Sequence, residues 1–201
     1  MKLYYARMTR SARPRWMLEE TGAPYELVRL DLAKGDHKQA EYMKIHPHGA
    51  VPALVDGDLA MFESAAICAY LADKFPEREL APAIGTKERG LYYQWLFYAM
   101  ATMEPPVVKV FLNTRFLPEE KRSPEAAEEG RTHWQQVGRT LDAALAGGRF
   151  IVGDQFTAAD VMVASIAGWA QFMGLLEGFP MLQGYVKRLA ERPAFQRANA
   201  D

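Results

Sequence analysis

The sequence contains a single cysteine, Cys68, among its 201 residues. One cysteine cannot form an intramolecular disulfide framework, so nothing in the chain requires an oxidising compartment. Cys68 falls in an apolar stretch and has no CxxC partner, which indicates a buried, unreactive side chain. We therefore expect a cytoplasmic protein in which this cysteine serves packing.

Long apolar runs and an excess of one charge are also missing. The most apolar stretch, residues 161–176, is too short for a comfortable membrane span and contains Ser165 and Gln171. The formal net charge is −1, and no basic patch indicates a nucleic-acid partner. The first ten residues lack the apolar core of a signal peptide. The composition predicts an ordinary soluble protein with no membrane and no nucleic-acid partner.

The stretch that organises the chain is residues 49–74. Residues 50–55 are short, apolar and rich in strand-forming side chains, and Asp56-Gly57-Asp58 supplies a hairpin turn. Residues 59–62 then form the return strand. Pro52 lies near the start of the first strand, where a missing N–H harms a central ladder. That strand is therefore an edge strand or carries an unusual peptide bond.

A cis Val51-Pro52 bond is the sharper prediction. After the return strand, a helix begins with Ser64 as its N-cap and is closed by Pro76. Its N-terminus opens beside Glu63, where free backbone donors suit a carboxylate and Glu63 can pair with an ammonium. A free α-amino acid group carries both charges. Alternatively, Ser64 only caps the helix and Glu63 only favours its dipole.

The preceding residues predict a strand at 2–5, a helix at 11–21 and a second strand at 25–32. A strand, a crossover helix and a strand imply a parallel pair. Together with the later hairpin and helix, the order is βαβ followed by ββα, a thioredoxin-like pattern. Residues 33–48 are polar, with a short helix around 39–44, and we expect them to form the rim of a ligand site.

The second half of the chain is predicted to be all helical. Residues 77–86 carry proline and glycine without periodicity and form the linker between domains 1–76 and 87–201. A helix beginning near Leu91 is expected to stop near Pro105-Pro106, and further helices end before Gly147 and Pro193. Thr157 and Asp160 match a capping box, with Phe156 able to staple onto the new helix.

Val51-Pro52 followed eleven residues later by Glu63-Ser64 resembles the glutathione-binding half of the glutathione S-transferases. The resemblance extends along nearly the whole chain. It implies an α/β plus all-α protein, with a thioredoxin-like domain and a helical bundle, that forms a homodimer and uses glutathione as co-substrate without a metal. It also implies that the Val51 backbone, before cis Pro52, pairs with the cysteinyl part of glutathione, while Glu63 and Ser64 hold the γ-glutamyl end.

Such an enzyme must stabilise the glutathione thiolate, because a free thiol titrates near about 8.5. Ser11 coincides with the serine that activates glutathione in theta-like transferases, and Thr9 is a second hydroxyl within reach. Arg10 stands where beta-type bacterial enzymes carry a cysteine, which disfavours thiol exchange but could place positive charge beside the thiolate. The alternative for Ser11 is a plain helix N-cap.

Further binding residues follow from the same resemblance. His37 precedes His46 by the spacing at which theta-like enzymes place a histidine that contacts the glycine carboxylate of glutathione; alternatively it is an ordinary surface histidine. Ala50 departs from the lysine that the family often carries before the Val-Pro step, so one carboxylate contact is either missing or supplied by an arginine or lysine elsewhere. Candidates for the second-substrate pocket are Tyr98, Thr102, Met103 and Trp169.

The sequence thus predicts a glutathione transferase that activates glutathione as a thiolate and adds it to a small hydrophobic electrophile, in the manner of detoxification enzymes. Two alternatives stay open. One is a glutathione-binding protein of low turnover, and the other is a glutathione-dependent isomerase or peroxidase on the same fold.

Overall fold

The computed structural model describes residues 1–200, and their contacts divide the chain into two compact units. The first unit comprises Met1–Ala81 together with the residues from Glu191 onward, and the second comprises Pro82–Ala190. The sequence analysis assigns the residues after Glu191 to the helical domain. The structure instead groups them with the first unit, because their helix packs against a helix there.

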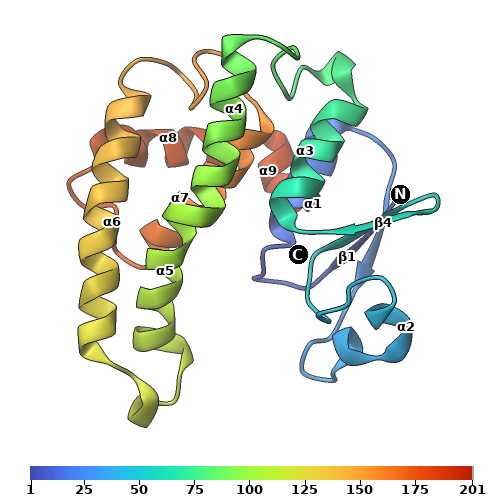
Figure 1. The fold of residues 1–201 in the computed structure, drawn as a ribbon, viewed down its shortest axis with the longest axis horizontal. Helices are drawn as coiled ribbons and strands as arrows, with labels where there is room; N and C mark the ends of the chain where they lie inside the picture. The colour runs from blue at the N-terminus through green and yellow to red at the C-terminus, as the bar shows by residue number, and fades with distance from the viewer. Residues whose placement is uncertain (201) are drawn as a thin grey trace. The chain divides into compact units, whose positions relative to one another are not determined.

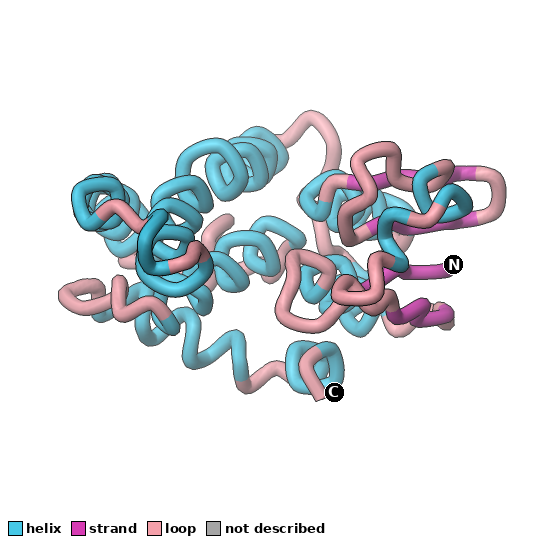
Figure 2. The backbone as a smooth tube through the Cα atoms, turned by 90° about the horizontal axis from the view of Figure 1, so that it is seen from below, coloured by secondary structure: helices cyan, strands magenta, loops and turns pink. Residues whose placement is uncertain are grey.

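The first unit is built on a four-stranded mixed sheet (Figures 1 and 2). Its strands are β1 (Lys2–Tyr5), β2 (Glu26–Arg29), β3 (Ala53–Asp56) and β4 (Leu59–Phe62). In the order β2-β1-β3-β4, the β1–β2 pair is parallel and the β1–β3 and β3–β4 pairs are antiparallel. The predicted order of strands and helices in this half of the chain is confirmed.

Helices flank this sheet in the first unit. They are α1 (Ala12–Thr21), α2 (Ala40–Met43), α3 (Ser64–Lys74) and α9 (Pro193–Ala198), with the short 3₁₀ helices η1 (Asp36–Lys38) and η2 (Pro76–Arg78). The crossover helix α1 buries Trp16, Met17 and Leu18 completely or nearly so. Gly22 ends it in the left-handed region, at φ 67°, and donates its N–H to the Leu18 carbonyl.

The hairpin between β3 and β4 follows the sequence closely. Gly57 takes φ 63° in the turn, and Ala53 pairs with Phe62 across the ladder. The Val51-Pro52 peptide bond is cis, as predicted. The edge-strand alternative is wrong, since β3 lies between β1 and β4. Pro52 precedes the first paired residue of β3, so its missing N–H removes no bond from the ladder.

The start of α3 differs from the expectation. Glu63, rather than Ser64, holds the N-cap position, with φ 72° and ψ 110°, and Ser64 is the first helical residue. The Glu63 side chain makes no capping hydrogen bond to the helix end. Ser64 is buried and its hydroxyl is used elsewhere, as described below.

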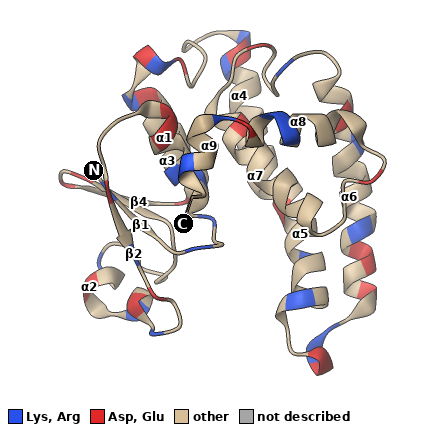
Figure 3. Ribbon diagram, turned by 180° about the vertical axis from the view of Figure 1, so that it is seen from behind, with Lys and Arg blue, Asp and Glu red and all other residues tan. Residues whose placement is uncertain are grey.

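The second unit is helical. Its segments are α4 (Lys87–Tyr98), the π-helical η3 (Ala99–Met103), α5 (Glu104–Phe111), the π-helical η4 (Leu112–Phe116), the 3₁₀ helix η5 (Glu119–Lys121), α6 (Pro124–Leu145), α7 (Ala158–Phe172) and α8 (Pro180–Ala190). α7 contacts α4, α5 and α8, which makes it the central helix of this unit. Acidic and basic residues share the outer face of α6 (Figure 3).

The predicted stop at Pro105-Pro106 is wrong, because helical backbone continues from α4 through η3 into α5. A proline inside a helix lacks the N–H for the ladder and crowds the preceding turn. Here the wider π-helical turn of η3 comes directly before the two prolines, which then occupy the first turn of α5.

The capping box at the start of α7 is confirmed, with the Thr157 and Asp160 side chains each bonding the other's backbone N–H. Asp160 does more than cap: its carboxylate also accepts from the Ile151 N–H at 2.9 Å and from the Tyr185 hydroxyl at 2.8 Å. Phe156 packs edge-on against Phe150. Asp160 therefore joins α7, α8 and the loop between α6 and α7.

The helices of residues 1–200 include none with the length and hydropathy of a membrane span.

We expect the stability of the second unit to depend on pH through Asp160. Burial raises the pKa of Asp160 to about 6, against the hydrogen bonds from Ile151 and Thr157 that lower it; in an unfolded chain it titrates near about 3.9. Between these values the folded protein binds the proton more tightly, so stability falls by about 2–3 kcal/mol as pH rises from about 4 to about 6.

Urea unfolding of the wild type and of Asp160→Asn across this pH range measures the effect. The variant does not titrate at this position, so the difference in unfolding free energy isolates Asp160. A difference that stays constant between about pH 4 and about pH 7 contradicts the prediction.

Candidate functional site

The sheet register brings three chain segments to one end of the sheet. Tyr4, near the end of β1, pairs with Ala53 at the start of β3, and Ala53 pairs in turn with Phe62 at the end of β4. The loop after β1, the cis-proline before β3 and the turn after β4 therefore lie at the same end of the sheet. The predicted glutathione-site residues Thr9, Pro52 and Glu63 lie on these three segments.

The loop after β1 holds two hydroxyl groups in contact. Ser11 is completely buried; its Oγ accepts from the Ala6 N–H at 3.1 Å and donates to the Ala6 carbonyl at 2.9 Å. The Thr9 Oγ1 lies 2.6 Å from Ser11 Oγ, and the Ser11 N–H donates to it at 3.3 Å. Thr9 is only half-buried. Of the two hydroxyls, that of Thr9 belongs to the more exposed residue.

Charged and exposed residues surround this pair. Arg7 and Arg10 are exposed, and Met8 between them is 97% exposed with φ 55°. A methionine in the left-handed region is uncommon, and such conformations concentrate at functional sites. The loop thus presents Thr9 between two cationic side chains.

The cis Val51-Pro52 step follows a segment that is anchored from the other side. The Tyr42 hydroxyl of α2 donates to the Ala50 carbonyl, directly before Val51. Burial raises the pKa of Tyr42 well above its usual range, so the hydroxyl remains a donor. Ala50, which stands where the family often carries a lysine, is therefore held through its backbone carbonyl.

The turn after β4 is strained and supported by a residue that the sequence analysis missed. Glu63 adopts φ 72°, a region that non-glycine residues enter at a cost of about 1–3 kcal/mol. Arg13, which is only 4% exposed, donates from Nη1 to the Ser64 Oγ at 3.3 Å. Arg13 is the second residue of α1, and its partner lies fifty-one residues away, so the sequence alone carries no signal for this bond.

Gly49, His37 and His46 lie in or beside residues 33–48, the predicted rim of the ligand site. A Cβ on Gly49, at φ 53°, would lie 2.5 Å from the His37 carbonyl oxygen and 2.7 Å from the Met43 Sδ. Within residues 1–200, the buried Nδ1 of His37 has no hydrogen-bond partner. His46 stacks on the Phe62 ring, and burial lowers its pKa, with His48 adding to the effect.

The residues proposed for a second-substrate pocket all lie in the second unit. Met103 is completely buried in its core, and Thr102 is exposed. Tyr98 packs edge-on against Trp95, and Trp169 packs edge-on against Phe111, with ring centroids 5.3 Å apart in both pairs. Tyr98 and Trp169 thus have different aromatic neighbours.

Cys68 is buried in α3, and burial raises the pKa of its thiol well above the usual range. Residues 1–200 contain no cluster of three His, Cys, Asp or Glu side chains able to hold a metal ion.

Comparison with known proteins decides the family. Residues 1–73 match the model of the glutathione S-transferase N-terminal domain, and residues 124–188 match that of the C-terminal domain. The chain belongs to the glutathione S-transferase family. All the proposed residues of the first unit fall within the first match, and Trp169 falls within the second.

Relatives of this transferase cover nearly its whole length. It is 32% identical to glutathione S-transferase 3 of Zea mays, over 92% of this chain and 86% of that protein. It is 34% identical to glutathione S-transferase Z2 of Arabidopsis thaliana, over 98% and 90%. A sphingomonad glutathione S-transferase, solved in complex with glutathione, has 30% identity and a TM-score of 0.86, covering 100% of this chain and 98% of that one. The predicted family, fold class and enzyme class are confirmed.

We expect the rim of this transferase to depend on Gly49. Alanine costs about 1–2 kcal/mol in the left-handed region wherever it stands. Gly49→Ala must also push its Cβ against the backbone of η1 and the Met43 side chain, so it should cost about 1–3 kcal/mol more.

Gly57→Ala is the matched control, because Gly57 has φ 63° but no atom within 4 Å of the added Cβ. Urea unfolding of both variants compares the two costs. Equal losses of stability would show that the rim is not packed against Gly49.

Proposed function

We propose that this transferase binds glutathione in the first unit, at the end of the sheet where β1 and β4 finish and β3 begins. It holds the glutathione thiol as a thiolate and adds the sulfur to a small hydrophobic electrophile. The observation that carries the proposal is the contact between Thr9 and Ser11 on the loop after β1, 2.6 Å between their hydroxyl oxygens. The sphingomonad relative, which is complexed with glutathione and covers this whole chain, supports the same ligand here.

The two hydroxyls have different roles in this proposal. Ser11 is buried and bonded to both backbone groups of Ala6, so it positions Thr9 rather than touching sulfur. The Thr9 Oγ1 accepts from the Ser11 N–H at 3.3 Å and donates to the Ala6 carbonyl at 2.7 Å, so in this proposal the Thr9 hydroxyl turns from that carbonyl to donate to the ligand sulfur. Hydrogen bonds in a row polarise one another, so Thr9 becomes a stronger donor than an isolated hydroxyl.

A donor to the charged sulfur favours the thiolate and lowers its pKa. Charge-assisted hydrogen bonds are worth about 1.5–3 kcal/mol, which corresponds to a pKa about 1–2 units lower. Starting from about 8.5, this makes a large fraction of the bound thiol nucleophilic at neutral pH. The exposed guanidinium groups of Arg7 and Arg10 act in the same direction.

The rest of glutathione has a partner for each of its groups. Glu63 offers a carboxylate to the γ-glutamyl ammonium, and Ser64 at the N-terminus of α3 suits the α-carboxylate. Arg13 fixes the Ser64 hydroxyl. The backbone of Val51 pairs with the cysteinyl part, and the unpartnered Nδ1 of His37 supports a contact between that histidine and the glycine carboxylate.

For the electrophile, Tyr98, Thr102 and Trp169 are retained as candidate contacts because each is at least partly accessible. Met103 supports them from the core.

Thr9→Val removes the hydroxyl while keeping the side-chain shape. We expect the variant to bind glutathione but to raise the pKa of its thiol by about 1–2 units, so that the acid limb of the rate profile moves to higher pH. Ser11→Ala should shift the pKa in the same direction, because it releases Thr9. Ultraviolet absorbance of the bound thiolate against pH, with turnover of an aryl halide, measures both.

Thr9→Ser is the matched control, since it retains the hydroxyl and should keep the wild-type profile. A Thr9→Val enzyme with wild-type thiolate and rate would remove Thr9 from the mechanism. Glutathione binding without thiolate in the wild type would instead favour the low-turnover binding protein, and thiolate without conjugation would favour the isomerase or peroxidase alternatives.

We also propose that the protein forms a homodimer through α4. Phe97 and Leu91 are 73% and 47% exposed on this helix, together with Tyr93. Large apolar side chains gathered on one surface helix mark an association site, and a second copy is the commonest partner of such a surface.

Sedimentation across a range of protein concentrations tests the dimer. Phe97→Glu should weaken it by at least about tenfold, because charge replaces an apolar anchor. Phe116→Glu is the control, since Phe116 is 66% exposed but belongs to η4 and not to α4. A wild type that sediments as a monomer at all concentrations would contradict the proposal.

A further inference from the structure

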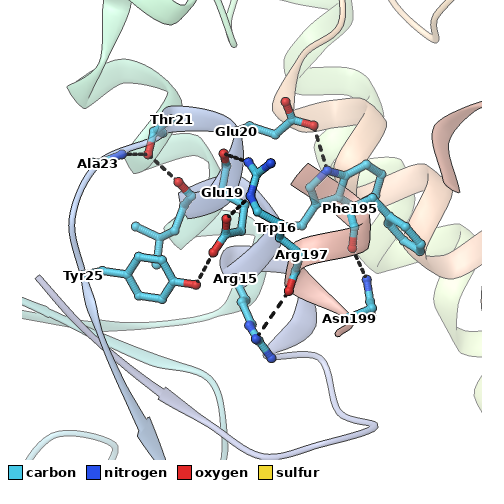
Figure 4. A network of polar contacts seen from close by, with 11 residues as sticks. Arg15, Trp16, Glu19, Glu20, Thr21, Ala23, Tyr25, Phe195, Arg197 and Asn199 are labelled. Atoms are coloured by element: carbon cyan, nitrogen blue, oxygen red, sulfur yellow. Dashed lines mark hydrogen bonds and ion pairs between the residues drawn. The ribbon is translucent and has the colours of Figure 1, made fainter. Parts of the chain in front are cut away.

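The C-terminal helix α9 is part of the glutathione-binding unit and lies beside α1 (Figures 1 and 4). Apolar contacts seat it there. The Trp16 and Phe195 rings meet edge to face with centroids 4.8 Å apart, and Ala194 and Ala198 are buried. The last helix of the second unit is α8, so α9 returns to the first unit after the whole helical unit has been formed.

An almost buried carboxylate on α1 anchors this contact. Glu20 has a side chain only 9% exposed, and it accepts from the Trp16 indole N–H at 2.8 Å. The Arg192 guanidinium, just before α9, donates to both oxygens of Glu20, at 2.6 and 2.8 Å. Forked pairs of this kind fix direction as well as distance, and shielding from water strengthens them.

A second anchor lies one residue earlier on α1 (Figure 4). Arg197 donates to the Glu19 carboxylate at 2.7 Å and to the Glu19 carbonyl at 3.1 Å. The Tyr25 hydroxyl donates to the other carboxylate oxygen at 2.7 Å. Glu19 therefore joins α9, α1 and the segment that leads into β2.

The Arg15 side chain connects α9 to the end of β1, where the loop that carries Thr9 and Ser11 begins. Arg15 donates to the Arg197 carbonyl at 3.5 Å, and its guanidinium lies over the Tyr5 ring, 5.0 Å from the centroid. Tyr5 is the last residue of β1, and the next residue, Ala6, holds Ser11. The Arg15 N–H also bonds the Ser11 carbonyl. Arg15 thus contacts α9, the end of β1 and Ser11.

We propose that α9 is a positioning element for the catalytic hydroxyls, with Arg192 and Glu20 as its principal positioning residues. The proposal rests on the proposed function, because it assigns to α9 the placement of Thr9 and Ser11. α1 is a short rigid rod, so fixing the Glu19 and Glu20 end fixes the Ser11 end. Displacing a reacting group by about 1 Å can cost about a hundredfold in rate, even when the change is remote.

The test compares full-length Arg192→Ala, Arg192→Lys and Arg197→Ala with the wild type. Arg192→Ala should lower kcat about tenfold with little change in KM for glutathione, and should raise the pKa of the bound thiol. Arg192→Lys keeps the charge but not the fork, so its kcat and thiol pKa should lie between those of the wild type and of Arg192→Ala. Arg197→Ala should show the smaller effect, because Arg197 is 56% exposed.

Two controls separate positioning from loss of folding. Arg131→Ala removes an exposed ion pair to Glu128 on α6 and should leave kcat and the pH profile unchanged. Val137→Ala opens a space in the core of the second unit and should lower the melting temperature without moving the thiol pKa. In addition, amide exchange of residues 191–200 should slow when glutathione saturates the enzyme, because coupling between the two places is reciprocal.

The outcomes distinguish the two proposals. If Thr9→Val loses thiolate while Arg192→Ala keeps the wild-type kcat and pH profile, α9 is not a positioning element and the proposed function stands. If Thr9→Val itself keeps thiolate, the proposed function fails first. Should Arg192→Ala fail to fold, a wild-type pH profile in both Arg192→Lys and Arg197→Ala overturns the proposal.

Discussion

The antiparallel pairing of β1 with β3 is the constraint on which the site depends. It sets Tyr4 opposite Ala53, and the β3–β4 ladder then sets Ala53 opposite Phe62. A slip of one residue would turn every side chain of β3 to the opposite face. The same slip would separate the loop after β1 from the cis-proline and from Glu63. Each of these segments is irregular, and only the ladder between them gives the irregular parts a common frame.

Within that frame the protein divides the work between buried and accessible groups. Ser11 and Ser64 are the fixed members, held by Ala6 and by Arg13. Thr9 and Glu63 are the members that contact glutathione in the proposed function, and Glu63 is kept in a conformation that costs free energy. The ladder at Phe62 on one side and α3 on the other hold it there. This rigidity is what a site needs to favour a charged sulfur over a neutral one.

Local patterns explain which parts of this could be predicted from the sequence. The hairpin turn, the cis-proline and the capping box each depend on a few neighbouring residues whose chemistry permits one outcome. The helix through Pro105-Pro106 was not predictable in this way, because the π-helical turn that accommodates it has no distinct side-chain signature. The burial of Ser11, the Arg13–Ser64 bond and the docking of α9 are contacts between distant segments. Spacing in the sequence carries no information about them.

The discontinuity of the first unit has a consequence for biosynthesis. Residues 191–200 leave the ribosome only after the entire helical unit has been made. Until then Trp16 lacks the Phe195 ring and Glu20 lacks Arg192, so the nascent thioredoxin-like unit presents to the cell an indole ring and a carboxylate without its arginine partner. Folding of the sheet can begin early, but its outer face is finished last. Because α9 supports the loop that carries Thr9 and Ser11, that loop is completed only when translation ends. A chain stalled within the helical unit would carry both hydroxyls without the contacts between α9 and α1.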